Sequence, residues 1–170
     1  MTDFIIMVEN TSYMFVTGPN VVKTVTNEEI SSEDLGGAMT HATKSGVTHL
    51  TAANDIDCID KIRGLLQYIP QNAQSITPCL PFSIREEYRE QLDNIVPENA
   101  NQPYDMREVV EGIVDDQSFL EIHENFAENI VVGFARLAGR SIGIVANQPM
   151  NLAGVLDVNS SKKAARFVRF

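Results

Sequence analysis

The sequence has no tryptophan, only two cysteines and far fewer basic than acidic side chains. Cys58 and Cys79 lack the paired spacing of a zinc site or a disulfide framework, so we expect no metal centre and a reducing compartment. The 13 basic side chains stand against 23 acidic ones, a net charge of −10. This balance argues against a general nucleic-acid-binding protein, because such proteins carry a basic surface. No apolar run approaches the ~20 residues that cross a bilayer, so no membrane span is expected.

What remains is the composition of an ordinary globular protein, with 44% hydrophobic and 21% charged residues. A length of 170 residues allows one domain or parts of two. The chain opens on a buried-type apolar run, residues 4–8, and closes within an amphipathic stretch, residues 162–170. We therefore expect it to be an internal part of a longer protein.

Hydrophobic periodicity and turn residues predict alternating strands and helices. Pro19 suits the first turn of a short helix that runs to Lys23. Polar residues and three prolines mark 70–82 as a surface connection, and we place a domain junction between about Pro70 and Pro103. Predicted strands cover 4–8, 13–17, 48–52, 119–122, 130–137 and 140–146, and predicted helices cover 32–45, 55–69, 85–92, 106–115 and 160–170.

Gly36 and Gly37 are the only adjacent glycines in the chain. They fall just inside a helix that Ser31 or Ser32 would begin, and each costs ~1 kcal/mol relative to alanine in a helix interior. Glycines persist in such places where the backbone must approach a neighbour closely or direct bare N–H groups at a ligand. From the glycines alone, tight packing between helices explains them equally well.

The order of the motifs around these glycines resembles the carboxyltransferase subunit of biotin-dependent acyl-CoA carboxylases. The resembling segments are residues 17–23, 33–49, 129–136, 145–149 and 156–170, and the subunits of propionyl-CoA carboxylase and methylmalonyl-CoA carboxyltransferase are the nearest branch. The resemblance implies an α/β fold of the ClpP/crotonase type, in parts of two similar domains. Residues 1–70 would be the C-terminal part of the first domain, 71–103 a linker, and 104–170 the N-terminal part of the second.

The resemblance also implies a reaction. A carboxyl group would move between carboxybiotin and Cα of a short acyl-CoA, such as propionyl-CoA, through a thioester enolate whose oxygen needs fixed hydrogen-bond donors. Biotin would arrive on a carboxyl carrier protein charged by a biotin carboxylase subunit. The intact subunit would be a homo-oligomer, located in the cytoplasm or, in a eukaryote, in the mitochondrial matrix. The family's other glycine-rich oxyanion segments are absent from this sequence, so we expect the chain alone to be inactive.

By the same resemblance, Gly36 and Gly37 supply backbone N–H groups to the enolate oxygen. The residues implied on the substrate side are Ala38, His41, Ser45 and Gly46, and those implied on the biotin side are Asn147, Gln148, Ser160 and Ser161.

Several of these side chains also have simpler interpretations. His41 and His49 suit packing or hydrogen bonding, and His123 suits a loop. Asn159 or Ser160 suits the N-cap of the last helix. Lys44, Lys162, Lys163 and Arg166 could meet phosphates of CoA, although solvated helix charges are the commoner case.

Two functions of other classes remain open at this point. A crotonase-like hydratase or isomerase would add a general acid/base carboxylate near the glycines. Glu33 and Asp34 precede the glycines, but they have the placement of ordinary charges at a helix N-terminus. The other alternative is a non-catalytic, truncated interaction fragment.

Overall fold

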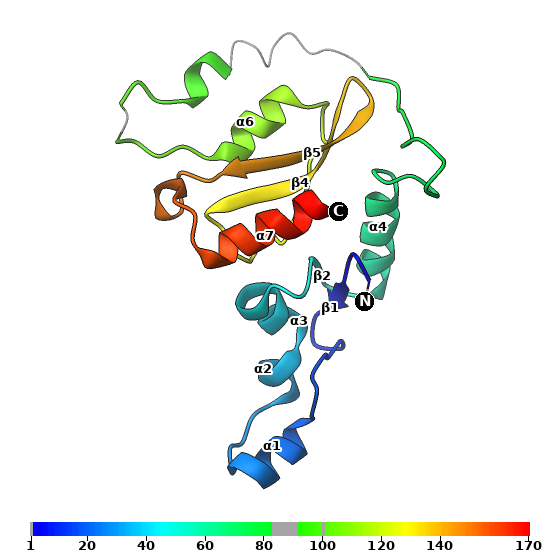
Figure 1. Cartoon of the computed structure of the whole chain (residues 1–170), viewed down its shortest axis with the longest axis vertical. Coiled ribbons are helices and arrows are strands. Elements are labelled where there is room, and N and C mark those ends of the chain that lie inside the picture. The colour runs from blue at the N-terminus through cyan, green and yellow to red at the C-terminus, as the bar shows by residue number, and fades with distance from the viewer. Residues whose placement is uncertain (1, 83–91, 100) are drawn as a thin grey trace. The chain divides into compact units, whose positions relative to one another are not determined.

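The computed structural model describes residues 2–82, 92–99 and 101–170 (Figure 1). These residues form two compact units, each described by itself below. Unit 1 consists of Met1–Arg63 together with His123–Phe126, and unit 2 consists of Gly64–Ile122 together with Ala127–Phe170. The helix predicted at 85–92 falls, but for its last residue, outside the described residues. The division of the intact protein at residues 70 and 103 stays a prediction.

Unit 1 is built on two short parallel strands. β1 (Ile6–Val8) pairs with β2 (Leu50–Ala52), close to the strands predicted at 4–8 and 48–52. Three helices lie along the chain between these strands, followed by a π-helical turn. They are α1 (Pro19–Thr26), α2 (Ser32–Gly36), α3 (Ala38–Thr40) and the turn His41–Ser45. α4 (Asp55–Leu66) follows β2, and the Asn54 side chain caps it by accepting the Asp57 N–H at 3.0 Å.

Two predictions for unit 1 are wrong in detail. Residues 13–17 form no strand, because their pairing is limited to a single bridge from Tyr13 to Gly37. The helix predicted over 32–45 is broken at Gly37, whose φ of −74° and ψ of 171° are extended. The break turns one expected helix into α2 and α3 with a sharp junction at Gly37.

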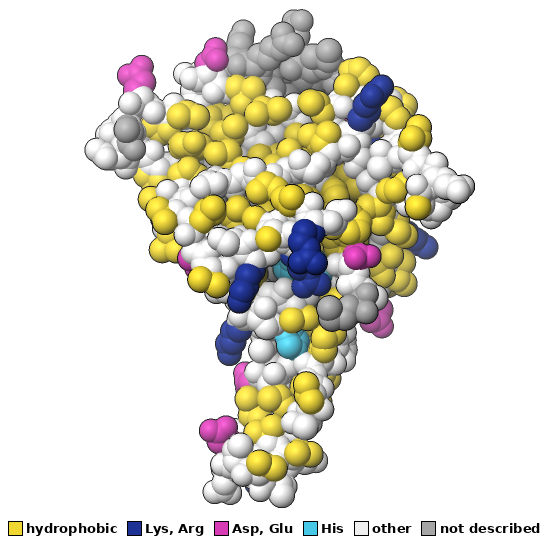
Figure 2. Space-filling model, in the orientation of Figure 1, with side chains coloured by type: hydrophobic (Ala, Val, Ile, Leu, Met, Phe, Trp, Pro, Cys, Tyr) yellow, Lys and Arg dark blue, Asp and Glu magenta, His cyan; other side chains and the backbone are white. Residues whose placement is uncertain are grey.

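Unit 2 is an antiparallel sheet in the order β3-β4-β5 with helices packed on it. β3 (Leu120–Ile122), β4 (Ile130–Leu137) and β5 (Arg140–Asn147) agree with the predicted strands. α6 (Met106–Ile113) and α7 (Val158–Arg169) both pack on β4, which is buried on both faces. Large hydrophobic side chains nevertheless remain exposed in this unit, and Figure 2 shows them gathered over it.

The two residues between the predicted strands, Ala138 and Gly139, form the turn of the β4–β5 hairpin. Both residues have positive φ, 52° and 75°, as a two-residue turn matched to the twist of the strands requires. The Asp115 carboxylate accepts the Ala138 N–H at 2.9 Å and the Gly139 N–H at 2.6 Å. A side chain two residues beyond the end of α6 therefore fixes the turn.

The segment His123–Phe126 joins unit 1 through Gly46 and His49. The His123 ring lies 4.2 Å from the His49 ring, its Nε2 donates to the Gly46 carbonyl at 3.0 Å, and its main-chain N–H donates to the His49 carbonyl at 2.8 Å. His123 is a loop residue, as expected, but it is only 4% exposed. Gly46 has a φ of +63°, and a Cβ there would lie 2.6 Å from the Phe126 ring.

Alanine at position 46 is expected to lower the free energy of unfolding by about 2 kcal/mol or more, because it combines a left-handed backbone with a clash against an aromatic ring. Gly64→Ala is the matched control, since a Cβ at Gly64 in α4 meets no atom within 4 Å. That change should raise the free energy of unfolding by about 0.5–1 kcal/mol. Urea unfolding of both variants measures the difference, and equal stability of the two would contradict the expectation.

Candidate functional site

The junction of α2 and α3 is held from both sides. As predicted, Ser31 is the N-cap of α2. Its hydroxyl accepts the Asp34 N–H at 3.0 Å. At the other end, the Gly36 carbonyl accepts the Met14 N–H and the Gly37 N–H is donated to the Glu33 carbonyl, both at 2.8 Å. α3 then starts at Ala38, so the N–H groups of its first turn have no acceptor within their own helix.

Neither glycine has room for a side chain. A Cβ on Gly36 would lie 2.3 Å from the Met14 carbonyl oxygen, and a Cβ on Gly37 would lie 2.2 Å from Oε1 of Glu33. Gly36, Gly37 and Ala38 are all buried. Close packing therefore requires the glycines whatever the junction binds, which supports the packing interpretation without deciding against the functional one.

The other residues implied on the substrate side follow directly after the junction. His41 ties the π-helical turn to the start of the chain: its Nε2 donates to the Met14 carbonyl, and its Nδ1 lies 2.8 Å from the Ser45 hydroxyl. Gly46 receives His123, as described above. The structure thus brings Ala38, His41, Ser45 and Gly46 into one short segment, and the His41 and Ser45 side chains are occupied by hydrogen bonds within unit 1.

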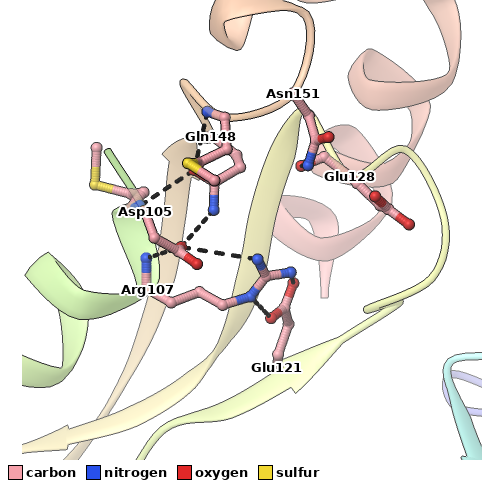
Figure 3. A network of polar contacts seen from close by, with 8 residues as sticks. Asp105, Arg107, Glu121, Glu128, Gln148 and Asn151 are labelled. Atoms are coloured by element: carbon pink, nitrogen blue, oxygen red, sulfur yellow. Dashed lines mark hydrogen bonds and ion pairs between the residues drawn. The ribbon is translucent and has the colours of Figure 1, made fainter. Parts of the chain in front are cut away.

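Gln148 is the centre of a polar network in unit 2 (Figure 3). Its side chain is fully buried, and its amide nitrogen donates to the Asp105 carboxylate at 2.6 Å. Its Oε1 accepts the Met106 N–H at 3.2 Å. Beside this contact, Arg107 makes two hydrogen bonds to the Glu121 carboxylate, at 2.6 and 3.1 Å. Gln148 therefore anchors the first turn of α6.

Two of the other three residues implied on the biotin side are also engaged internally. The Asn147 amide donates to the Gly154 carbonyl at 2.7 Å. Ser160 is fully buried and exchanges hydrogen bonds with Asp157, which is the N-cap of α7. The prediction of Asn159 or Ser160 as the N-cap is wrong, because the helix begins earlier, at Val158. Ser161 is exposed.

The charged side chains differ in burial. Lys44, Lys162 and Arg166 are exposed, as solvated helix charges would be. Lys163 is only 2% exposed, and its ammonium group donates to the Ala127 carbonyl at 3.4 Å. The expectation of a solvated charge is therefore wrong for Lys163, because the side chain points from α7 into unit 2.

Ser160 controls the acidity of Asp157. Hydrogen bonds from the Ser160 N–H and from its hydroxyl hold the pKa of the Asp157 carboxyl below its ordinary value of 3.8. Because the folded-state pKa is lowered, the resulting stabilisation is present above pH 3.8 and is lost as the pH falls through the lowered value. Ser160→Ala should move the pKa back toward 3.8, whereas Ser161→Ala should not. Carboxyl NMR titration measures both, and an unchanged pKa in Ser160→Ala would refute the assignment.

Residues 2–82, 92–99 and 101–170 contain no group of three or more His, Cys, Asp or Glu side chains that could hold a metal ion. None of the helices in that part of the chain is long and apolar enough to cross a membrane.

Comparison with known proteins gives strong matches along the whole length. The chain is 53% identical over 171 residues to the propionyl-CoA carboxylase beta chain of Roseobacter denitrificans, covering all of this chain and 34% of that protein. It is 52% identical over 178 residues to the biotin-dependent acetyl-/propionyl-coenzyme A carboxylase beta5 subunit of Mycobacterium tuberculosis, covering 99% of this chain and 32% of that protein. The chain thus spans about a third of the length of these relatives.

Among solved structures, transcarboxylase 12S superposes with a TM-score of 0.94 at 42% identity, over 99% of this chain and 33% of that one. The expected α/β fold of the crotonase type is confirmed by this likeness. The model of the carboxyl transferase domain matches residues 1–170. The chain therefore belongs to the carboxyl transferase family.

Proposed function

We propose that the intact protein is a carboxyltransferase that moves a carboxyl group between biotin and Cα of a short acyl-CoA. The relatives are named as propionyl-CoA and biotin-dependent acetyl-/propionyl-CoA carboxylase subunits. The transcarboxylase 12S structure is described with methylmalonyl-coenzyme A bound and as a hexamer. These names favour an acyl-CoA substrate, and they give no support to the hydratase or isomerase alternative.

The observation that carries the proposal to this chain is the α2–α3 junction. The extended backbone of Gly37 ends α2 and precedes α3. The first N–H groups of α3 therefore follow a buried segment, Gly36 to Ala38, whose largest side chain is a methyl group. Such amides suit the oxygen of a thioester enolate, because they are rigid and add no bulk. Since the Gly37 N–H is donated to Glu33, the Ala38 N–H is the first candidate donor, and Gly36 and Gly37 shape its approach.

The partners follow from the reaction. Biotin would be presented by a carboxyl carrier protein after charging by a biotin carboxylase subunit. The intact subunit would form a homo-oligomer, in the cytoplasm or, in a eukaryote, in the mitochondrial matrix. Of the four residues implied on the biotin side, Asn147 and Ser161 are exposed. The Asn147 amide already donates to Gly154, so Ser161 is better placed to touch a partner. The role of the other three residues would be indirect. The internal hydrogen bonds of Asn147, Gln148 and Ser160 would hold the backbone around them in the conformation that the partner meets.

The test is incorporation of labelled bicarbonate into propionyl-CoA by the intact subunit, supplied with ATP, biotin carboxylase and biotinylated carrier. We expect incorporation that depends on the carrier, and no hydration of an enoyl-CoA. Hydration without incorporation would refute the proposal.

The 170-residue chain alone is expected to be inactive in the same assay, since it has one Gly-Gly segment and carboxyl transfer needs several oxyanion donors. Measurable incorporation by this chain would contradict the expectation.

A further inference from the structure

Glu33 has an unusual position for an acidic residue in the first turn of a helix. Asp34 makes the ordinary contact, a hydrogen bond from the Ser31 hydroxyl at 2.6 Å. The Glu33 side chain instead extends along α2 toward its C-terminal end, so that its carboxyl group lies against Gly37. Its Oε2 is buried and, in the part of the chain that the structure describes, accepts no hydrogen bond. The carboxyl group therefore acts there through the volume that it fills.

That volume is the one that a side chain at Gly37 would need. A Cβ built on Gly37 would lie 2.2 Å from Oε1 and 2.3 Å from Cδ of Glu33. The main chain of Glu33 holds the same junction, because its carbonyl accepts the Gly37 N–H at 2.8 Å and the Thr40 hydroxyl at 3.0 Å. Side chain and main chain of one residue thus fix the end of α2 and the start of α3.

We infer that Glu33 is a positioning residue that acts through Gly37, its carboxyl group filling the place of the missing side chain and so setting the direction of the first amides of α3. This inference rests on the proposed function of the junction. Oxyanion donors are sensitive to small displacements, because a shift of about 1 Å in a reacting group can cost two orders of magnitude in rate. The carboxyl group itself touches no reacting atom in this scheme.

Removing the side chain should separate kcat from KM. In the intact subunit, Glu33→Ala is expected to lower kcat about tenfold or more while KM for the acyl-CoA stays within about twofold. Glu33→Gln should keep most of the activity, because the amide fills the same volume. Asp34→Asn is the matched control and should leave kcat within about twofold, since Asp34 contacts Ser31 and not Gly37.

A double-mutant cycle with Gly37→Ala tests whether Glu33 acts through Gly37. In the double variant the new methyl group enters the space that Glu33→Ala vacates, so the loss of kcat should be no greater than that of Gly37→Ala alone. Losses that multiply, or a Glu33→Gln variant as impaired as Glu33→Ala, would overturn the inference.

Failure of the proposed function would look different. If the unsubstituted intact subunit transfers no carboxyl group, the proposed function fails. The same four forms of the 170-residue chain, compared by urea unfolding, then still report on the contact: coupled losses support the pairing of Glu33 with Gly37, and additive losses refute it.

Discussion

Alanine at Gly37 is expected to lower carboxyl transfer by the intact subunit about 10²–10³-fold, the usual cost of losing one oxyanion donor. The added methyl group would lie 2.2 Å from the Glu33 carboxylate and 2.7 Å from the Glu33 carbonyl oxygen. The side chain can move, but the carbonyl is main chain, so the junction must shift. The shift would displace the Ala38 N–H from the enolate oxygen.

The measurement is kcat together with the free energy of unfolding. Gly18→Ala, also in unit 1, is the matched control, because a Cβ there would lie 3.5 Å from Phe15, an ordinary contact. If Gly37 acts only in packing, activity should fall in proportion to the fraction unfolded and return on cooling. A folded Gly37→Ala variant with full activity would refute the role of the junction.

Replacing Arg136 with methionine is expected to lower the free energy of unfolding by about 3–5 kcal/mol, because buried acceptors would lose a charged donor. Arg136 is 4% exposed, and its guanidinium group donates to the carbonyls of Gln67, Pro78 and Gly139, at 2.6, 2.9 and 3.0 Å. It also lies 5.0 Å from the centre of the Tyr68 ring. One side chain on β4 therefore holds the connection after α4 against the hairpin turn.

Arg140→Met is the matched control, because Arg140 is an exposed arginine on the same hairpin, and it should change stability by no more than about 0.5 kcal/mol. Tyr68 gives a second measurement. Burial raises the pKa of its phenol above 10.0, and the nearby Arg136 charge opposes that rise. Loss of the charge should raise the pKa further, which absorbance titration against Tyr68→Phe detects. Equal stability of the two methionine variants would contradict the role of Arg136.

The raised pKa of Tyr68 makes folding stability fall at alkaline pH. Because the folded-state pKa lies above the ordinary value, folding stability is unaffected below about pH 10 and falls as the pH rises through the folded pKa. The Tyr68→Phe variant should lack this component of the alkaline loss.

Local patterns predicted the elements of unit 2 well. The strands of the β4–β5 hairpin have the apolar runs expected of them, and Ala138-Gly139 supplies the two positive φ values of the turn. α4 likewise forms where a helix is predicted and ends before Pro70, although Ile56, Ile59, Ile62 and Leu66 are exposed on it. In these places the residues that decide the conformation are neighbours in sequence, so pattern and structure agree.

Prediction failed where distant residues decide the outcome. Residues 13–17 have the composition of a strand, but their one bridge, to Gly37, is too little to make one. The roles of Gln148 and Arg136 depend on acceptors 43 and 58 residues away along the chain, Asp105 and Pro78. Glu33 is a different case, because the pattern predicts an ordinary charge at a helix N-terminus and the structure places its carboxyl group against Gly37. The sequence signal for this contact is the spacing of four residues between Glu33 and Gly37, which places them about one helical turn apart.

The four residues His123–Phe126 belong to unit 1 although both of their flanking segments belong to unit 2. The polypeptide therefore passes from one unit to the other three times. A single recombination event cannot exchange either unit between two related genes as a whole, because one crossover would separate His123 and Phe126 from the Gly46 and His49 that receive them. We therefore expect the segment around Gly46 and His49 to be inherited together with His123–Phe126. A hybrid gene joined between residues 63 and 123 would take the two sides of this contact from different parents.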